Sequence, residues 1–352
     1  KMKTMKPDTQ VSATTQYEES ENIPTNPTNY RTIGDIINKR FDRRNVLKGA
    51  LGVTAITSLA SSPLALVAGS GAADAQGISF AFKEISHGAD EKHHVAEGYN
   101  ADVLIRWGDP VLPGARPFDP ATLTADEQEN LFGYNNDFVG YVPLPFGSND
   151  PNHGLLCINH EYTDEELMFP GLGQYPKKMD TDTKSSKPIT EVEMAAHGGS
   201  IIEIKRENAT AKWRIITNSQ YARRISTRST EIVLDGPAAG HPRLVTSADP
   251  SGTRVIGTLN NCAGGITAWG TYLMAEENIH GYFWGDKKGE PPADHPEAKN
   301  LKRMGIPRKR YAWGKYHKRF NIHQEPQEAN RFGWIVEVDP LDPTSTPRKH
   351  TA

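Results

Sequence analysis

The sequence contains very little cysteine, few long hydrophobic runs and scarce helical periodicity. Only Cys157 and Cys262 carry thiols among 352 residues, so at most one intramolecular disulfide can form. The formal net charge of −3 excludes a strong overall charge excess of the kind that binds nucleic acid or an anionic membrane. The abundant residues are 31 glycines and 25 prolines, which favour turns and strands over long helices.

The first 75 residues are expected to lie outside the folded domain. Residues 1–42 are polar and poor in large apolar side chains, which is typical of disorder. Residues 43–75 begin with two arginines, continue as an uncharged stretch and end in small residues, which is the layout of a twin-arginine export signal cleaved after Ala75. The alternative, a transmembrane helix, has nearly enough length, but Pro63 and many small residues make it weakly hydrophobic. We therefore expect export by the twin-arginine machinery to a periplasmic or secreted location, without a stable membrane anchor.

Residues 76–352 alternate short apolar runs with turn residues, which indicates an all-β domain with short helices and inserted loops. Helices are expected at 124–132 and 190–196, the second with a capping box between Thr190 and Glu193. The predicted strands are 101–107, 154–159, 199–205, 213–217, 254–259, 272–276 and 332–339.

A weak internal repeat relates residues 199–205 to residues 333–339. Both segments contain Gly, any residue, Ile, an aliphatic residue, Glu, an aliphatic residue and a charged residue, in that order. Repeated units of this kind favour a β-propeller, although a β-sandwich would give similar strands.

Two segments are predicted to leave the sheets. Residues 174–188 are charged and rich in Ser and Thr, and residues 285–319 are rich in Lys, Arg and Pro. The aromatic residues among the basic ones imitate a nucleic-acid surface. We expect a solvated insertion without a nucleic-acid partner, because the rest of the chain cancels its charge.

Polar side chains gather where the predicted strands end. Amide and carboxylate oxygens suit calcium and a thiolate suits iron or another transition metal, so the combination predicts a multinuclear metal site. Because Glu276 and Glu277 would point to opposite faces of a strand, one of them is expected to lie outside that site. The groups are Asn135-Asn136-Asp137, Asn159-His160-Glu161, Asn260-Asn261-Cys262 and Glu276-Glu277-Asn278.

Other interpretations of these residues remain open. Cys262 would fit a buried apolar position, or a covalent nucleophile with His160 or His241 as its base. His160 is equally compatible with a structural role. Arg224 is suited to clamp a phosphate, but an ordinary salt bridge would explain it as well.

Taken together, the motifs resemble those of the PhoX-type alkaline phosphatases, in the same order along the chain. The resemblance runs from about Ser79 to the end and includes the export signal. The motifs are FGYNNDF at 132–138, NHEYT at 159–163, YARR at 221–224, DGPAAGH at 235–241, NNCAGG at 260–265, WGT at 269–271, EEN at 276–278 and GWIVEVDP at 333–340.

This resemblance implies a monomeric, exported β-propeller phosphomonoesterase that contains iron and calcium and acts on small phosphate esters at alkaline pH. In such an enzyme a metal-bound oxo or hydroxo group would attack phosphorus in line. Cys262 would bridge two irons, and Glu277 and Glu337 would be carboxylate ligands of the catalytic cluster. The resemblance also implies weaker candidates for metal ligands, which are Glu276, Glu161, Asn159 and Asp137. It implies two weak candidates for contact with the phosphate, which are Arg224 and His241.

The sequence departs from the family at two places. Ala268 stands where a proline is common, and the chain stops at Ala352, where the family continues into a motif with further Arg and carboxylate residues. We therefore expect an incomplete propeller that lacks its C-terminal blades and some metal ligands. The alternatives to a phosphatase are a non-catalytic exported metal-binding propeller and an inactive truncated fragment.

Overall fold

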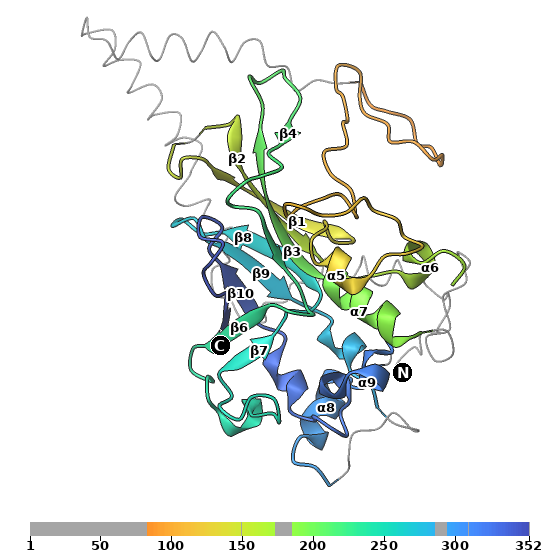
Figure 1. Ribbon diagram of the computed structural model, residues 1–352, viewed down its shortest axis with the longest axis vertical. Helices are drawn as coiled ribbons and strands as arrows, with labels where there is room; N and C mark the ends of the chain where they lie inside the picture. Colours follow the sequence, from red (N-terminus) through yellow and green to blue (C-terminus); the bar gives the residue numbers. More distant parts are fainter. Residues whose placement is uncertain (1–82, 149, 173–184, 286–293, 309, 352) are drawn as a thin grey trace, which may run out of the picture. The chain divides into compact units, whose positions relative to one another are not determined.

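The computed structural model describes residues 83–148, 150–172, 185–285, 294–308 and 310–351 (Figure 1). The chain divides into two compact units, residues 1–100 and residues 101–352. In the first unit, residues 83–100 contain only turns and irregular structure. The predicted segments 1–42 and 43–75 lie outside the described residues. Among the residues that are described, no helix has the length and apolar character needed to cross a membrane.

The first of two sheets in the second unit has five antiparallel strands. Its central part runs in the order β1-β2-β3-β4, and β5 pairs with the first half of β3. The strands are β1 Asn136–Pro143, β2 His153–His160, β3 Gly198–Lys205, β4 Arg214–Ile215 and β5 Arg223–Ile225.

The second sheet has six strands in the order β7-β6-β11-β10-β9-β8. All neighbouring strands are antiparallel except β11 and β6, which are parallel. The strands are β6 Glu231–Asp235, β7 Arg254–Ile256, β8 Asn261–Ile266, β9 Tyr272–Glu276, β10 Ile335–Val338 and β11 Arg348–His350.

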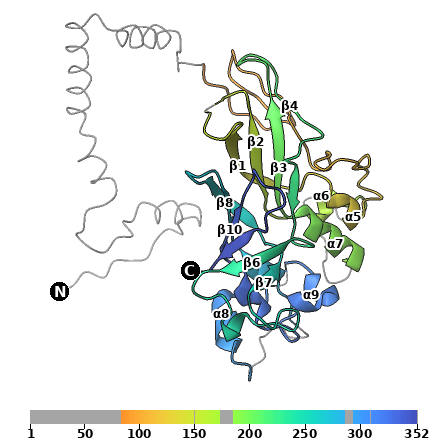
Figure 2. The ribbon, with the colours of Figure 1, turned by 60° about the vertical axis from the view of Figure 1, so that its left-hand side comes forward.

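Short helices accompany the sheets, with α5, α6 and α7 beside the five-stranded sheet and α8 and α9 farther along the unit (Figures 1 and 2). The α-helices are α5 Ala125–Gln128, α6 Glu165–Met168, α7 Lys187–Ala196, α8 Ala298–Met304 and α9 Trp313–Tyr316. The 3-10 helices are η1 Pro242–Leu244, η2 Ile279–Tyr282, η3 Lys318–Phe320 and η4 Glu328–Arg331.

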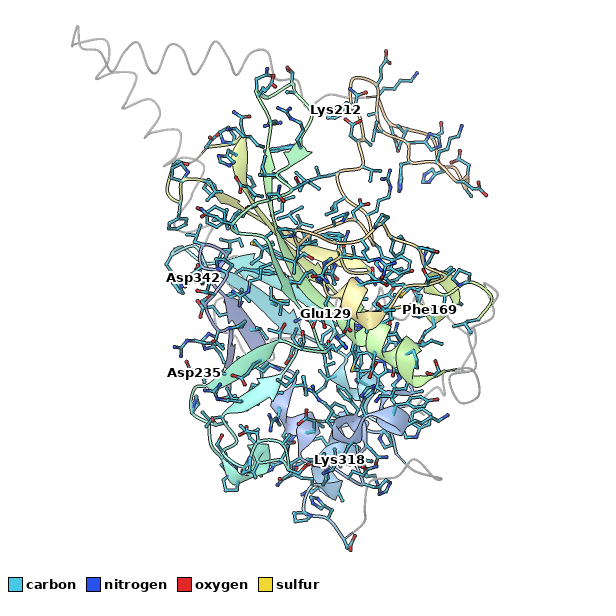
Figure 3. All side chains as sticks on the ribbon, in the orientation of Figure 1. Glu129, Phe169, Lys212, Asp235, Lys318 and Asp342 are labelled. Carbon is cyan, nitrogen blue, oxygen red and sulfur yellow. The ribbon has the colours of Figure 1, made fainter. Side chains whose placement is uncertain are left out.

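The main core joins the two sheets. Its buried side chains come from both sheets and from residues 282–332, and a smaller cluster that includes Phe132, Ile158 and Ile202 lies apart from it. The sheets meet where Phe138 of β1 lies against Gly264 of β8, since a Cβ atom at Gly264 would lie 2.5 Å from the Phe138 ring. Glu129, labelled near the centre of Figure 3, accepts a hydrogen bond from Ser226 Oγ at 2.9 Å and so ties the end of α5 to the loop after β5.

Several predicted strands are confirmed, and others are shorter or absent. The predictions at 154–159, 199–205 and 272–276 coincide with β2, β3 and β9. Residues 101–107 form no strand: Val103 is exposed, and Trp107 turns inward to pack against the rings of Phe118 and Tyr134. Strand β7 ends early because Gly257 adopts φ +79° against the backbone of Thr227, a conformation that interrupts a strand.

The helix predicted at 190–196 begins earlier, and its predicted capping box is wrong. Pro188 occupies the first turn, where its missing N–H costs nothing, so the helix starts at Lys187. Thr190 donates its hydroxyl to the Lys187 carbonyl, and Glu193 accepts from the indole of Trp313. A capping box does form at α5, between Thr124 and Glu127.

The basic segment 285–319 is not simply a solvated insertion. Tyr311 and Trp313 are fully buried in the main core, and Tyr282 stacks on Tyr311 with ring centroids 4.7 Å apart. Two of the three aromatic residues that imitated a nucleic-acid surface are therefore core residues, whereas the third, Tyr316, is exposed. Lys309 and residues 286–293 lie outside the described part of this segment.

The internal repeat corresponds to equivalent side-chain arrangements in the two sheets. In β3, Glu203 contacts His153 Nε2 at 2.7 Å and accepts from a serine, Ser219, at 2.5 Å. In β10, Glu337 contacts His350 Nε2 at 2.7 Å and accepts from a threonine, Thr271, at 2.5 Å. Each glutamate thus ties its strand to neighbouring segments in the same way.

Candidate metal centre

Four acidic or thiol side chains from both sheets converge at the junction between the sheets. One ligand atom from each of Asp137, Glu161 and Cys262 lies within 4.8 Å of the other two. Glu277 adjoins them, since its carboxylate hydrogen-bonds the Cys262 thiol and acts electrostatically on Glu161. We call these four residues the acid–thiol cluster.

Strand register explains why residues far apart in sequence meet there. Asn136 pairs with His160 across β1 and β2, which places Asp137 and Glu161 at the same end of that strand pair. Asn261 pairs with Glu276 across β8 and β9, which does the same for Cys262 and Glu277. Each sheet therefore supplies two of the four side chains.

Asn159 fastens the two sheets together behind the cluster. Its amide Nδ2 donates to the carbonyl oxygens of Cys262 at 2.8 Å and Ala263 at 3.0 Å, and its Oδ1 accepts from the Tyr272 hydroxyl. The Asn159 side chain is fully buried. Its side-chain oxygen and nitrogen both hydrogen-bond to protein groups. The structure therefore places Asn159, a predicted ligand, behind the cluster, where it links the two sheets.

Three asparagines next to the cluster have left-handed backbones. Asn135, Asn260 and Asn278 have φ values of 51°, 48° and 42°, and no other non-glycine residue of the described chain has a positive φ. Asparagine tolerates this region better than most residues do, and such conformations concentrate at functional sites. The Glu161 N–H donates to the Asn135 carbonyl at 2.9 Å, and the Glu277 N–H donates to the Asn260 carbonyl at 3.0 Å. Asn135 and Asn260 therefore fix the backbones of two of the four cluster residues, Glu161 and Glu277.

Asn260 also leaves a polar atom without a protein partner. Its Nδ2 donates to Glu161 Oε1 at 3.0 Å, whereas its Oδ1 is buried and has no hydrogen-bond partner. Buried oxygens are nearly always satisfied, and an amide oxygen beside carboxylates is a ligand type that calcium accepts. The thiol adds a ligand for a softer metal. The residues present therefore fit a cation site with both hard and soft ligands.

The electrostatics of the cluster also favour a bound cation. Burial, followed by hydrogen bonds and repulsion from Asp137 and Glu277, raises the pKa of the Cys262 thiol to about 12. Burial and the same two carboxylates raise the pKa of Glu161. Like charges held this close oppose one another's ionisation, and a bound cation reverses that preference. Asp137 and Glu277 are exposed, so the cluster is open to solvent on their side.

This environment argues against Cys262 as a nucleophile. Reactive cysteines have a lowered pKa, usually beside a cationic group. His160 is fully buried, contacts Ser200 Oγ at 2.7 Å and accepts from the Gly133 N–H at 3.2 Å. His241 caps η1 and accepts from the Arg243 N–H. Neither histidine hydrogen-bonds Cys262, and both cysteines are free thiols.

Glu276 and Glu337 lie apart from the cluster. The Glu276 carboxylate accepts from Lys349 Nζ at 2.9 Å and from several backbone N–H groups, in a fully buried pair. Glu337 accepts from Thr271 and Trp269 and contacts His350. As predicted for adjacent strand residues, Glu276 and Glu277 face different surroundings.

The two predicted phosphate contacts are also placed elsewhere. Arg224 is buried and donates to the carbonyl oxygens of Gly199 at 2.6 Å and Ala195 at 2.7 Å, and burial lowers its pKa to about 10. His241 lies in the loop after β6. Among the described residues, the structure therefore brings neither side chain to the cluster. Asn135 and Asn260 belong to the polar groups that the sequence placed at strand ends, although neither was assigned as a ligand, and the structure shows that their left-handed backbones support the cluster.

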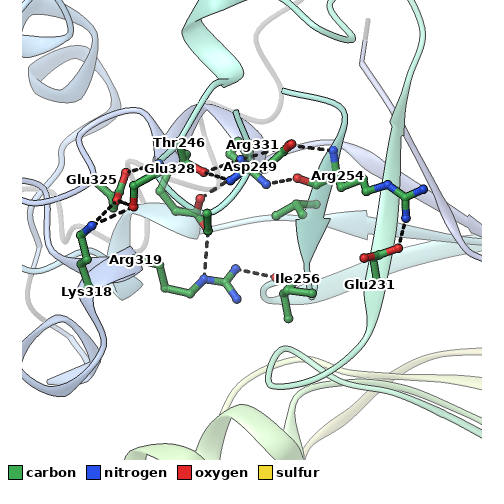
Figure 4. A pocket seen from close by; sticks show the side chains of 13 residues that line it. Glu231, Thr246, Asp249, Arg254, Ile256, Lys318, Arg319, Glu325, Glu328 and Arg331 are labelled. Carbon is green, nitrogen blue, oxygen red and sulfur yellow. Dashed lines mark hydrogen bonds and ion pairs between the residues drawn. The ribbon is translucent and has the colours of Figure 1, made fainter. Parts of the chain in front are cut away.

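A separate pocket of about 280 Å³ lies at the edge of the six-stranded sheet (Figure 4). Its charges are paired with one another, since Lys318 contacts Glu325 at 2.9 Å and Arg319 contacts Glu328 at 2.9 Å. Arg319 also donates to the carbonyl of Ile256 and so covers the edge of β7. These internal pairs account for Lys318 and Arg319 of the basic segment.

The fold and the cluster define a protein of two β-sheets with a mixed group of carboxylates and a thiol where the sheets meet. Comparison with known proteins identifies its relatives. The family model described as alkaline phosphatase PhoX matches residues 80–352, so the chain belongs to this family. The resemblance inferred from the motifs is thereby confirmed.

A solved structure supports the same relationship. The structure of Pseudomonas fluorescens PhoX in complex with vanadate, a transition state analogue, is 36% identical to this chain with a TM-score of 0.66. The match covers 76% of this chain and 43% of that protein, so the chain spans less than half of its relative's length. No curated protein sequence matches the chain.

Proposed function

We propose that this chain carries a metal-binding part of an exported phosphomonoesterase that releases phosphate from small organic esters. The observation that carries the proposal is the convergence of Asp137, Glu161 and Cys262 within 4.8 Å, in a chain of the PhoX family. Calcium and iron are the proposed metals, because the donors are carboxylate and amide oxygens together with a thiol. Bound cations would neutralise the charge of the phosphate and polarise it as Lewis acids.

The residues of the chain have distinct tasks in this proposal. Asp137, Glu161, Cys262 and Glu277 would hold the cations, and the proton that the raised pKa keeps on the Cys262 thiol would leave as a cation binds. Asn260 orients the Glu161 carboxylate through its Nδ2 and presents its free Oδ1. The exposed carboxylates of Asp137 and Glu277 mark the side from which an ester reaches the cations. Positioning and electrostatics supply most of the rate in phosphoryl transfer, so this fixed geometry is the contribution of the chain.

The wider architecture and the route of export belong to the same proposal. We assign the two sheets to blades of a β-propeller, supported by the matching Glu203 and Glu337 arrangements in β3 and β10. Arg43 and Arg44 support export through the twin-arginine machinery to the periplasm or medium. A monomer acting on a small phosphate ester fits this assignment.

Cys262→Ser tests the proposal directly. In the wild-type chain we expect bound iron and calcium by elemental analysis and release of 4-nitrophenol from its phosphate ester. The variant should lose iron and lower the turnover number by at least about 100-fold, because the thiolate ligand is gone. Cys157→Ser is the matched control and should retain iron. Full activity and full iron content in Cys262→Ser would contradict the proposal.

A second function is favoured by one observation. Neither Arg224 nor His241 lies at the cluster, and among the described residues no cationic side chain hydrogen-bonds to Asp137, Glu161, Cys262 or Glu277. Such a site would suit a cation-binding module without catalysis. Stoichiometric metal with no turnover of any phosphate ester would establish this second function in place of the first.

A further inference from the structure

A fully paired carboxylate lies directly behind the acid–thiol cluster. Glu276, the last residue of β9, is nearly buried and precedes Glu277. Its Oε1 accepts from the Thr258 hydroxyl at 2.9 Å and from the Leu259 N–H at 3.1 Å. Its Oε2 accepts from the N–H groups of Gly333 at 2.9 Å and Trp334 at 3.1 Å. The carboxylate therefore joins two loops that come from distant parts of the sequence.

A buried lysine completes this arrangement. Lys349 of β11 has no exposed surface, and its ammonium group donates to Glu276 Oε1 at 2.9 Å. It also donates to the carbonyl oxygens of Gly257 at 3.2 Å and Arg331 at 3.1 Å, and lies 4.1 Å from the centre of the Phe332 ring. Lysine is almost never fully buried unless it is paired, and here three oxygen acceptors take its three protons.

The segment held by Glu276 leads straight into the cluster. The Thr258 hydroxyl that donates to Glu276 also accepts from Asn261 Nδ2 at 2.7 Å, so the turn from 258 to 261 is closed on itself. Within that turn Asn260 has its left-handed backbone, orients Glu161 and accepts from the Glu277 N–H. Cys262 is the next residue after the turn. Cys262 directly follows Asn261, and Glu277 directly follows Glu276. Both cluster residues are therefore adjacent in sequence to residues that the buried pair holds in place.

We infer that Lys349 and Glu276 are positioning residues of the cation site, which hold the 258–261 turn so that Asn260, Cys262 and Glu277 converge. This inference rests on the proposed cation site. The buried pair thus has a second role beyond stabilising the fold, which is to place the residues that bind the cation. Groups that orient metal ligands without touching the metal typically change metal affinity by about 10- to 100-fold when they are replaced.

The test uses the double variant Glu276→Gln/Lys349→Met in the full chain, with calcium alone as the probe. Replacing both members of a buried ion pair by neutral groups of similar size is often tolerated, so we expect the thermal unfolding midpoint to shift by no more than about 4 °C. Calcium affinity, measured by titration calorimetry after removal of bound metal, should nevertheless fall by about 10-fold or more. The variant would then lose calcium affinity without a matching loss of thermal stability, a result that a purely structural role does not predict.

A second ion pair, in which Glu297 is buried and Arg243 is exposed, provides the control. Arg243 and Glu297 form a two-point contact at 2.7 Å with no hydrogen bond to the 258–262 segment. Arg243→Met/Glu297→Gln should leave calcium affinity within about twofold of the wild type, whatever its effect on the midpoint. The inference is overturned if the Glu276/Lys349 double variant binds calcium as tightly as the wild type, or if the control variant loses the same affinity. Absence of calcium binding by the wild type would instead overturn the proposed cation site itself.

Discussion

Glu276 and Glu277 are neighbours in sequence but occupy opposite surroundings. The region behind β9 gives Glu276 a buried lysine, a hydroxyl and three backbone N–H groups. The cluster in front gives Glu277 a thiol and two further carboxylates as neighbours. A carboxylate whose oxygens already accept from fixed donors stabilises the fold, whereas carboxylates that face one another are suited to a cation. The number of donors around each group, rather than its residue type, distinguishes the two regions.

The two cysteines show the same contrast. Cys157 is fully buried in the main core, and burial alone raises the pKa of its thiol. Cys262 is half-buried, and two carboxylates add to the effect of burial. One thiol is therefore a packing group, and the other belongs to the cluster.

Replacing each cysteine by serine should give the largest difference between the two thiols, measured as the free energy of unfolding. In metal-free protein, Cys157→Ser places a hydroxyl in an apolar site and should lower the free energy of unfolding by about 1–3 kcal/mol. Cys262→Ser should change it by less than about 0.5 kcal/mol, because its surroundings are already polar. Unfolding in guanidinium chloride with a chelator present measures both. Equal losses would show that the cluster is packed like the core.

Asn260 allows a test of backbone strain in the open region. At φ 48°, alanine should cost about 1–2 kcal/mol relative to glycine in the unfolding free energy, because only glycine occupies this region freely. Both Asn260→Ala and Asn260→Gly lose the contact with Glu161, so their difference isolates the backbone. Urea unfolding of the two variants gives that difference. Identical stabilities would mean that the left-handed conformation is not required.

A buried pair of carboxyl groups should give the smallest effect, through pH. Burial, followed by their mutual repulsion, raises the pKa of Glu193, and burial raises that of Glu165. Because the folded state keeps protons that the unfolded state releases above about pH 4.5, these groups favour folding most in acid. Their contribution is lost as pH rises towards the raised pKa values. Glu193→Gln should therefore flatten the fall in urea midpoint between pH 5 and pH 8. An unchanged slope would assign the pH dependence to other groups.

The apolar strands could be predicted from the sequence, and all four cluster residues were among its candidate metal ligands. Strands such as β2, β3 and β9 are rich in large apolar residues, which pack on the core. Strand β8 contains Asn, Cys, Ala and two Gly, so no propensity reveals it, and its pairing with β9 decides its conformation. The order of the motifs along the chain indicated the resemblance to the PhoX family.

Long-range contacts explain why the structure places several predicted site residues away from the cluster. Glu337 could not be separated from Glu277 without knowing that His350 and Thr271 approach it. Arg224 could not be recognised as a buried donor to backbone carbonyls without the pairing of β3 with β5. Asn260 was one of several asparagines at strand ends, and the structure alone shows that its buried Oδ1 has no hydrogen-bond partner.

Anomalous X-ray diffraction from crystals of the metal-loaded chain, measured at the iron absorption edge, tests the central claim most directly. The account predicts an iron peak bonded to the Cys262 sulfur, with the carboxylates of Asp137, Glu161 and Glu277 around the metal centre. An iron peak at Glu337 or Glu276 with none at Cys262, or no metal at the junction of the sheets, would contradict it.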